Sequence, residues 1–152
     1  MHITFRKALI TDLPTIVEML ADDALGQSRE KFEHPLPHSY TEAFRKINND
    51  PDQQLMVVVS ENLELVGTLQ LSFLRYLTYQ GGIRAQIEAV RIKKGFRGLG
   101  IGREMFLWAI AQARKKGAHV LQLTTDKRRP EAIDFYKGLG FKNSHEGMKL
   151  HL

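Results

Sequence analysis

Three glycines at alternate positions, Gly98, Gly100 and Gly102, stand between a strand-like run over residues 83–93 and an amphipathic helix over residues 100–116. Because glycine has no side chain, successive backbone N–H groups of this segment can converge on one anion. The positive end of the helix dipole adds to that attraction. The pattern therefore predicts a chain that carries an anion-binding loop where a strand leads into a helix.

Spacing excludes two common phosphate-binding loops. A P-loop needs a lysine followed by a hydroxyl residue at the helix start, whereas Gly102 is followed by Arg103 and Glu104. A dinucleotide-binding loop needs a third glycine where Arg103 stands and an acidic residue about 20 positions further on. The chain reads Val120-Leu121-Gln122 there, so neither loop fits.

The apolar periodicity predicts a chain of mixed strands and helices. The order is β-α-α-β-β-β-α-β-α-β, an α/β (α+β) arrangement, and residues 25–39 are predicted as an irregular loop because of their prolines and Gly26. We expect a single domain over residues 1–152. The predicted strands cover residues 2–8, 55–60, 64–76, 83–93, 120–124 and 141–150, and the predicted helices cover residues 12–22, 40–49, 100–116 and 130–139.

Composition and charge limit the classes of partner. The longest apolar run is Leu55–Val59 and the amino-terminal residues lack an apolar leader core, so we expect no membrane span, no secretory signal and a cytoplasmic protein. With no cysteine, a disulfide framework and a thiolate metal site are excluded. Residues 1–76 hold 7 Lys and Arg against 11 Asp and Glu, whereas residues 77–152 hold 15 against 6, giving net charges of −4 and +9. The basic half predicts an anionic partner.

Two motifs together resemble a known superfamily. The loop has the form Arg97-x-x-Gly100-x-Gly102, and downstream the chain reads Ala132-x-x-x-Tyr136-x-x-x-Gly140-Phe141. In this order and on these elements, they resemble the GNAT superfamily of acyl-CoA-dependent N-acetyltransferases. The resemblance covers residues 88–141. It implies a mixed, mostly antiparallel central sheet flanked by helices, acetyl-CoA as co-substrate, a small-molecule or peptide amine as acceptor, no metal, and a homodimer.

The resemblance also implies which residues hold the co-substrate. Backbone groups of Val90, Arg91 and Ile92 would pair with the pantetheine arm, where the fourth strand splays from the fifth. The pyrophosphate would lie on Arg97, Gly98, Leu99, Gly100, Ile101 and Gly102. Many members carry an asparagine after the fifth strand, whereas this chain reads Thr125-Asp126-Lys127-Arg128-Arg129-Pro130. The asparagine expected to contact the pantetheine arm thus has no counterpart here, and Lys127, Arg128 and Arg129 are candidates for the 3′-phosphate.

Tyr136 is the candidate general acid. Acetyl transfer from a thioester to an amine needs a neutral amine, a polarised carbonyl and a proton for the departing thiolate. The resemblance places Tyr136 at the acid position, and a phenol near the sulfur can donate that proton. In the alternative interpretation, Tyr136 only packs with Phe135 and Leu139 against the sheet.

Glu88 is the candidate general base. Strand alternation predicts that residues 88, 90 and 92 share one face, with residues 87 and 89 on the other. A carboxylate beside an apolar strand surface has its pKa raised by desolvation, and it can accept a proton directly or through water. Alternatively, Glu88 binds a cationic acceptor or pairs with Arg84 or Arg91.

The histidines of the early loop give a weaker signal. His34 and His38 lie where the family covers its acceptor site, so they can gate or bind the acceptor, or simply be solvated. Together with Glu30 and Glu33 they invite comparison with a zinc site, but the spacing offers no regular third ligand, and we predict no metal site.

Two other functions are open from the sequence. The same fold can serve as a non-enzymatic acyl-CoA sensor or regulatory module, since the loop and Tyr136 do not establish turnover. Nucleic-acid binding through the basic half is the other, but the chain has no helix-turn-helix pattern and no interleaved aromatic and basic strand, so we predict no nucleic-acid partner. The acceptor itself is not specified by these motifs.

Overall fold

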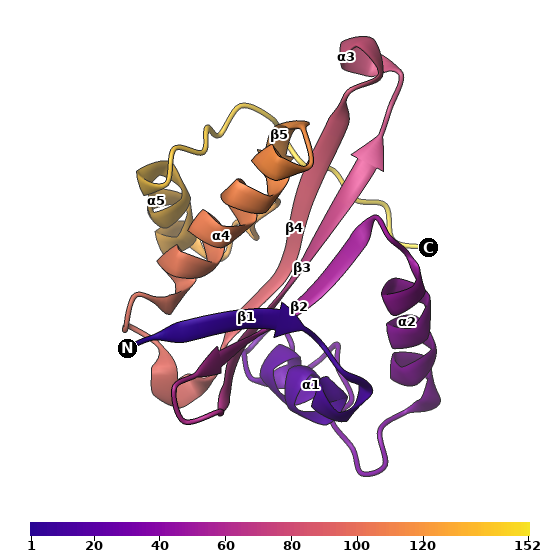
Figure 1. Cartoon of the computed structure of the whole chain (residues 1–152), viewed down its shortest axis with the longest axis vertical. Coiled ribbons are helices and arrows are strands. Elements are labelled where there is room, and N and C mark those ends of the chain that lie inside the picture. The colour runs from indigo at the N-terminus through magenta and orange to yellow at the C-terminus, as the bar shows by residue number, and fades with distance from the viewer.

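Five strands form one mixed sheet in the computed structural model, which describes residues 1–152. They lie side by side in chain order, and each neighbouring pair is antiparallel except β4 and β5, which are parallel (Figure 1). The predicted α/β fold with a mixed, mostly antiparallel sheet is therefore confirmed. The strands are β1 (Ile3–Lys7), β2 (Gln53–Ser60), β3 (Leu65–Arg75), β4 (Ile83–Ile92) and β5 (Ala118–Gln122).

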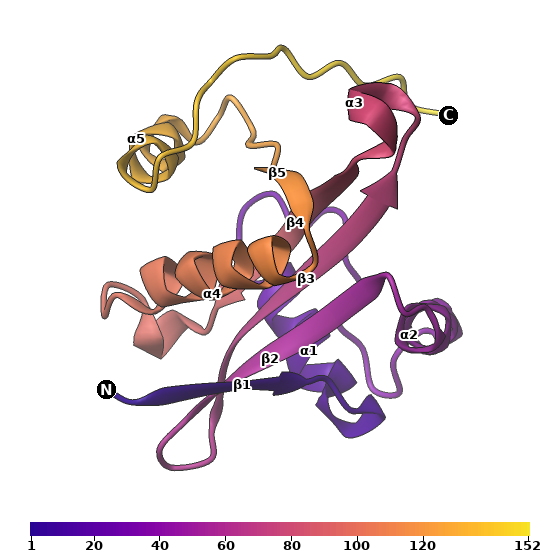
Figure 2. The same cartoon turned by 45° about the horizontal axis from the view of Figure 1, so that its top comes forward.

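Helices cover both faces of this sheet (Figure 2). One face carries α1 (Leu13–Ala21) and α2 (His38–Asn49), and the other carries α4 (Ile101–Lys115) and α5 (Pro130–Gly138). Successive side chains of β2 point to opposite faces of the sheet and so contribute to two separate cores. Met56 and Val58 belong to the buried cluster under α4, whereas Val57 and Val59 belong to the cluster under α1 and α2. Three short helical turns complete the chain, namely η1 (Ile10–Asp12), α3 (Thr78–Gly81) and η2 (Lys94–Phe96).

Glycines in the left-handed region delimit α4. Gly100 has φ +82° at its N-cap and Gly117 has φ +76° just beyond its end, where residues with a Cβ are strained. Arg114 and Lys115 lie in the last turn, as the helix dipole favours. The buried stripe of α4 includes Met105, so the helix is anchored firmly to the sheet at the end of the predicted loop.

The predicted final strand over residues 141–150 is wrong. From Leu139 onward the chain forms no strand and follows an irregular path from α5 to the other side of the molecule (Figures 1 and 2). The turn-forming residues Asn143-Ser144 and Gly147 interrupt the apolar alternation, leaving runs too short to pair. Met148 and Leu150 are exposed as a result.

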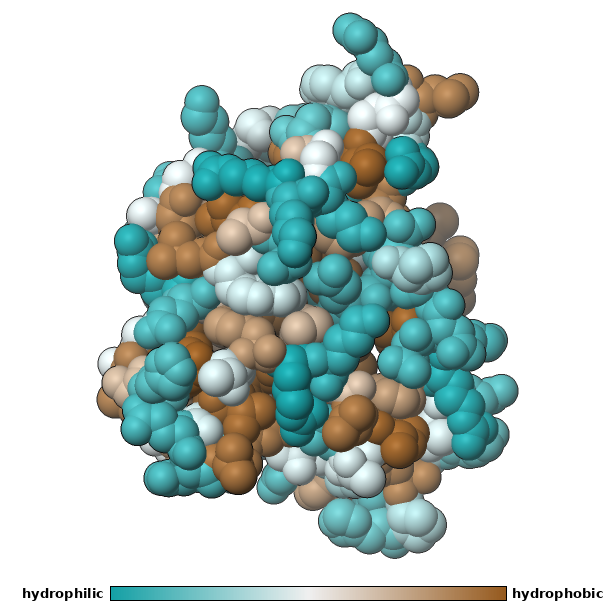
Figure 3. Space-filling view, viewed as in Figure 1, coloured by the Kyte–Doolittle hydropathy of each residue, from teal (hydrophilic) through white to brown (hydrophobic).

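Polar side chains cover most of the face shown in Figure 3, with apolar patches between them. Leu77 and Tyr79, at the tip where β3 turns into β4, are among the exposed apolar residues. At that tip Tyr79 and Gln80 adopt positive φ angles, so the chain reverses through a left-handed turn. No helix has both the length and the apolar character needed to cross a membrane.

Candidate active site

The pairing between β4 and β5 ends well before β4 does. Ile83–Gln86 pair with Ala118–Gln122, and β4 then continues to Ile92 with no strand on that side. The backbone edge of residues 87–92 is therefore open toward the segment that leads to α5. This is where the resemblance expects the fourth strand to splay from the fifth.

A bulge interrupts β4 at the opening. The register with β3 jumps from the pair Gln70–Glu88 to the pair Thr68–Arg91, so that two β4 residues, Ala89 and Val90, stand where one would pair. Ala89 has φ +53°, a conformation that residues with a Cβ rarely adopt. An extra residue of this kind interrupts the hydrogen bonds between the two strands, and it turns the side chains that follow it toward the other face of the sheet.

The bulge overturns one expectation about which residues share a face. Val90 and Ile92 pack against the cluster under α4, together with Ile87, whereas Glu88 lies on the opposite face. Alternation predicts that residues 88, 90 and 92 point the same way, and this prediction is wrong because the extra residue of the bulge reverses the alternation of the side chains beyond it. The side chain of Arg91 consequently faces the α1 side of the sheet, where it meets Asp23.

The glycine segment forms an open cradle at the start of α4. Gly98 and Gly100 both have positive φ, and a Cβ built on either would meet nothing within 4 Å. The first amides of a helix have no partner within that helix, so those at the start of α4 face this open space. The predicted loop between strand and helix is thus present, with Leu99 exposed and Ile101 buried as its anchor.

Arg97 reaches from this cradle to the end of α1. Its Nη2 lies 3.1 Å from Oδ2 of Asp22, and its Nε donates to the carbonyl of Ile92 at 3.1 Å. The arginine that the resemblance assigns to pyrophosphate is therefore held by a carboxylate and by the open strand edge. An anion entering the cradle would compete with Asp22 for the guanidinium.

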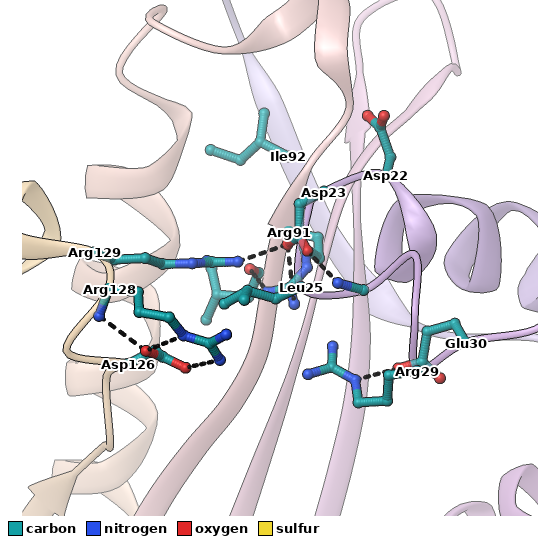
Figure 4. A network of polar contacts seen from close by, with 12 residues as sticks. Asp22, Asp23, Leu25, Arg29, Glu30, Arg91, Ile92, Asp126, Arg128 and Arg129 are labelled. Carbon is teal, nitrogen blue, oxygen red and sulfur yellow. Dashed lines mark hydrogen bonds and ion pairs between the residues drawn. The ribbon is translucent and has the colours of Figure 1, made fainter.

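Asp23 lies at the centre of a second ionic contact (Figure 4). Its Oδ2 is 2.7 Å from Nη2 of Arg129 and 3.5 Å from Nη2 of Arg91, so one carboxylate joins β4 to the segment before α5. Burial alone would raise the pKa of Asp23, but the amide of Gly26 and the two guanidinium groups outweigh it, and the pKa lies below its ordinary value. The carboxylate is therefore ionised at neutral pH.

Arg91 is the most buried of these cations. Burial lowers its pKa, and the nearby carboxylate of Asp23 partly offsets that effect. Its Nη1 donates to the carbonyl of Val90 at 2.9 Å, while its Nε is buried without a hydrogen-bond partner. Two carbonyls of the open edge, those of Val90 and Ile92, thus accept hydrogen bonds from arginine side chains of the same protein.

Tyr136 lies beside the opening from the α5 side. Its ring packs against the core cluster and meets Phe106 and Phe141 edge-on, at centroid distances of 5.4 and 6.1 Å. Burial raises the pKa of its phenol, although the positive charges of Arg129 and Arg91 act in the opposite direction. The phenol therefore stays protonated at neutral pH, and the packing interpretation and the acid interpretation are compatible with the same position.

Glu88 has a different environment from the one expected. It is exposed, so the desolvation predicted from an apolar strand surface is absent. Its Oε1 accepts a hydrogen bond from Nε2 of Gln86 at 2.9 Å, and it pairs with neither Arg84 nor Arg91. The carboxylate thus stands at the bulge, on the α1 side of the sheet, free of an ionic partner.

The remaining candidates lie apart from the opening. Arg128 pairs with Asp126 at 2.7 Å, and Lys127 lies 3.6 Å from Glu146. His34 contacts Phe32 edge-on in the early loop, and the structure brings together no group of three His, Asp or Glu side chains.

No pattern in the sequence indicated the contribution of the two aspartates that follow α1. Asp22 and Asp23 reach Arg97 and Arg129, which are 75 and 106 residues away along the chain. Neither aspartate carries a local motif, so only the fold could reveal these contacts. The bulge at Ala89 also had no signal, because an alanine inside a strand run predicts ordinary alternation.

Comparison with known proteins identifies the family. Residues 17–141 match the Acetyltransferase (GNAT) family. The aminoalkylphosphonate N-acetyltransferase of Salmonella typhimurium is 33% identical over 84 residues, which is 55% of this chain and 54% of that protein. The chain thus spans about half the length of this curated relative, and less of a second one from Methanocaldococcus jannaschii.

Solved structures agree with this fold. A transcriptional regulator from Bacillus halodurans C-125 is 52% identical and superposes with a TM-score of 0.95 over 99% of this chain and all of that one. A predicted acetyltransferase from Clostridium acetobutylicum, solved with acetyl-CoA, is 20% identical with a TM-score of 0.75 over 99% of this chain and 96% of that one. The chain therefore belongs to the GNAT acetyltransferase family.

Proposed function

We propose that this protein transfers the acetyl group of acetyl-CoA to a primary amine by direct attack within a ternary complex. The observation that carries the proposal is the meeting of three features at one opening. These are the anion cradle at the start of α4, the phenol of Tyr136 and the carboxylate of Glu88 at the β4 bulge.

Co-substrate binding uses the cradle and the open strand edge. The pyrophosphate lies on Arg97, Gly98, Leu99, Gly100, Ile101 and Gly102, where amides and the helix dipole favour an anion. The pantetheine arm runs along Val90, Arg91 and Ile92. Because arginine side chains already occupy the carbonyls of Val90 and Ile92, binding exchanges these internal hydrogen bonds for bonds to the arm.

The chemical step needs two proton transfers. The amine nitrogen attacks the thioester carbonyl, a C–N bond forms, the C–S bond breaks, and the CoA thiolate takes a proton from the hydroxyl of Tyr136. The proton lost by the amine passes to Glu88, directly or through water. A protonated phenol and a carboxylate without an ionic partner, on opposite faces of β4, can thus serve the two ends of the reaction without a covalent intermediate.

A turnover assay tests the proposal directly. The chain has no cysteine, so a thiol reagent reports only CoA released by the reaction. The acceptor panel should include simple alkylamines, polyamines, amino acids, peptide amino termini and aminoalkylphosphonates, the last because of the Salmonella relative. We expect amine-dependent CoA release. Binding of acetyl-CoA without release from any acceptor would contradict the enzymatic proposal.

A regulatory module of the same fold is the second candidate. It is favoured by one observation, the 52% identity to a transcriptional regulator from Bacillus halodurans C-125. This candidate predicts tight acyl-CoA binding with no amine-dependent turnover, and a response of a partner to that binding. The same assay separates the two, because only the enzyme consumes acetyl-CoA in proportion to the acceptor.

A further inference from the structure

We infer that the acceptor carries a compact apolar group, which enters a cavity between α1, α2 and the sheet. This inference rests on the proposed function and names the class of amine that the site takes. The cavity measures about 100 Å³. Its walls include Ile16 and Leu20 from α1, Phe44 from α2, and Gln70 and Ala89 from the sheet.

The position of the cavity connects it to the reaction. Ala89 is the bulge residue, and Gln70 pairs with Glu88 across the strands. A group inside the cavity therefore lies next to the proposed base and against the backbone of the bulge. The neighbouring carboxylate of Glu88 is exposed and has no ionic partner, so it is available to the amine of the same ligand.

The lining favours an apolar group because its polar side chains, those of Tyr40, Thr68 and Gln70, each already donate a hydrogen bond within the protein. The hydroxyl of Tyr40 donates to Glu30 and accepts from the amide of Lys31, both at 3.0 Å. The hydroxyl of Thr68 donates to the carbonyl of Met56 at 2.9 Å, and the amide of Gln70 donates to Gln53. A charged or hydroxylated group would lose its hydration there, and few groups of the lining remain to replace it.

The face of the sheet assigns the cavity to the acceptor rather than to the acyl chain. The cradle that receives CoA lies at the start of α4, whereas the cavity lies under α1 and α2 on the opposite face. Glu88, the proposed base, lies on the same face as the cavity, so an amine whose apolar group is held there has its proton acceptor beside it. An apolar cavity of about 150 Å³ holds a benzene ring. The cavity of this protein is smaller, at about 100 Å³, and therefore suits a group of about four or five carbon atoms.

Three primary amines of similar basicity test the inference: 3-methylbutylamine, methylamine and 1,4-diaminobutane. We expect kcat/KM for 3-methylbutylamine to exceed both others by roughly ten- to hundredfold, as extra carbons in an apolar pocket do. Equal values, or a preference for the diamine, would overturn the inference while leaving acetyl transfer intact. Absence of turnover with every amine would instead count against the proposed function.

Variants of α2 give the matched control. Ala43 lines the cavity and is exposed at its rim, so Ala43→Phe should reduce the advantage of 3-methylbutylamine over methylamine at least fivefold. Asn49→Phe adds the same ring to an exposed position of α2 outside the lining, and it should leave that ratio unchanged. Leu20→Phe narrows the cavity from α1 and gives a second obstruction if Ala43→Phe does not fold.

Two further measurements distinguish an amine from an acyl group as the occupant of the cavity. If Ala43→Phe abolishes use of 3-methylbutyryl-CoA but leaves the ranking of amines unchanged, the cavity holds the acyl group and the inference is wrong. Calorimetry of 3-methylbutylamine with the CoA-saturated protein works even without turnover. Binding that weakens in Ala43→Phe supports the inference, and no binding to the wild-type protein overturns it.

Discussion

The two faces of the sheet are built differently. Under α4 lies a continuous cluster of 14 buried residues, and the anion cradle next to it consists mostly of backbone. Under α1 and α2 the buried cluster has 7 residues, a cavity of about 100 Å³ remains, and carboxylates at the end of α1 reach across to arginines. The face with the denser packing is therefore the one on which we propose that the co-substrate binds.

We expect the two faces to recognise their ligands in different ways. Backbone amides on a well-packed helix give the same anion site whatever side chains surround them. On the other face, recognition depends on side chains and on unfilled space, which substitution alters easily. Changes near α4 should therefore affect co-substrate binding or the chemical step, and changes near α1 and α2 should affect the acceptor and the ionic contacts.

The largest effect is expected from Tyr136→Phe. Loss of a general acid lowers turnover by about a hundredfold or more, whereas the affinity for acetyl-CoA should change little because the ring still packs with Phe106. The raised pKa keeps the phenol protonated through neutral pH, so any loss of activity due to its ionisation occurs above its ordinary value of 10.0. Steady-state kinetics and calorimetry check both points, and unchanged turnover would leave Tyr136 with a packing role only.

Gly100→Ala should weaken acetyl-CoA binding by roughly tenfold or more. The new methyl group projects into the cradle, and the left-handed backbone costs about 1 kcal/mol of folding free energy for a residue with a Cβ. Gly117→Ala is the matched control, because Gly117 also has positive φ and open space but lies at the far end of α4. Equal loss of affinity in the two variants would show that strain alone is responsible.

Glu88→Gln should lower turnover by about tenfold, with little change in acetyl-CoA affinity. The amide keeps the size of the side chain but cannot accept the proton of the amine. Glu42→Gln, at an exposed position of α2, is the control. If turnover and acceptor affinity both survive in Glu88→Gln, the carboxylate has no part in the reaction, and the α1 face contributes binding only.

Asp23→Asn should destabilise the protein by about 1 kcal/mol at neutral pH, since its contacts with Arg129 and Arg91 are partly buried. Because the pKa of Asp23 is lowered on folding, its contribution is present above the unfolded value of about 3.9 and is lost as the pH falls through the lower folded value. Denaturant unfolding at pH 7 and in acid measures this. A difference from wild type that persists unchanged at pH 2 would argue against an ionic origin.

The smallest effect is expected from Asp22→Asn, which should tighten acetyl-CoA binding by about two- to fivefold. Asp22 competes with the pyrophosphate for Arg97, and an exposed ion pair is worth less than about 1 kcal/mol. Asp12→Asn removes a carboxylate that pairs with Arg6 of β1 instead, and it should leave the affinity unchanged. A weaker binding in Asp22→Asn would mean that the carboxylate orients Arg97 rather than competing with the ligand.

Local signals predicted most of the fold. The apolar periodicity located every strand of the sheet within a few residues, and Gly117 marked the end of α4 because a helix C-terminus favours a left-handed residue. The strand predicted over residues 141–150 failed because strand formation depends on a partner, and no local pattern reports whether one is present.

The site was predictable where it depends on sequence motifs and not where it depends on tertiary contacts. The cradle from Arg97 to Gly102 follows from glycine chemistry. The face of Glu88 does not, because one residue in a left-handed conformation at Ala89 reverses the alternation beyond it. The carboxylates of α1 were equally hidden, since their arginine partners lie far away in the chain.

The cations around the cradle should affect the rate at which an anionic ligand associates with the protein. Lys94 and Arg103 are exposed and make no ion pair, unlike Arg97. Charges of this kind act before contact, by steering an oppositely charged molecule toward its site. The association rate of a polyanion such as CoA should therefore fall as ionic strength rises, because the Debye length shrinks to about 8 Å at physiological salt. The dissociation rate depends on the amides of the cradle and should change much less.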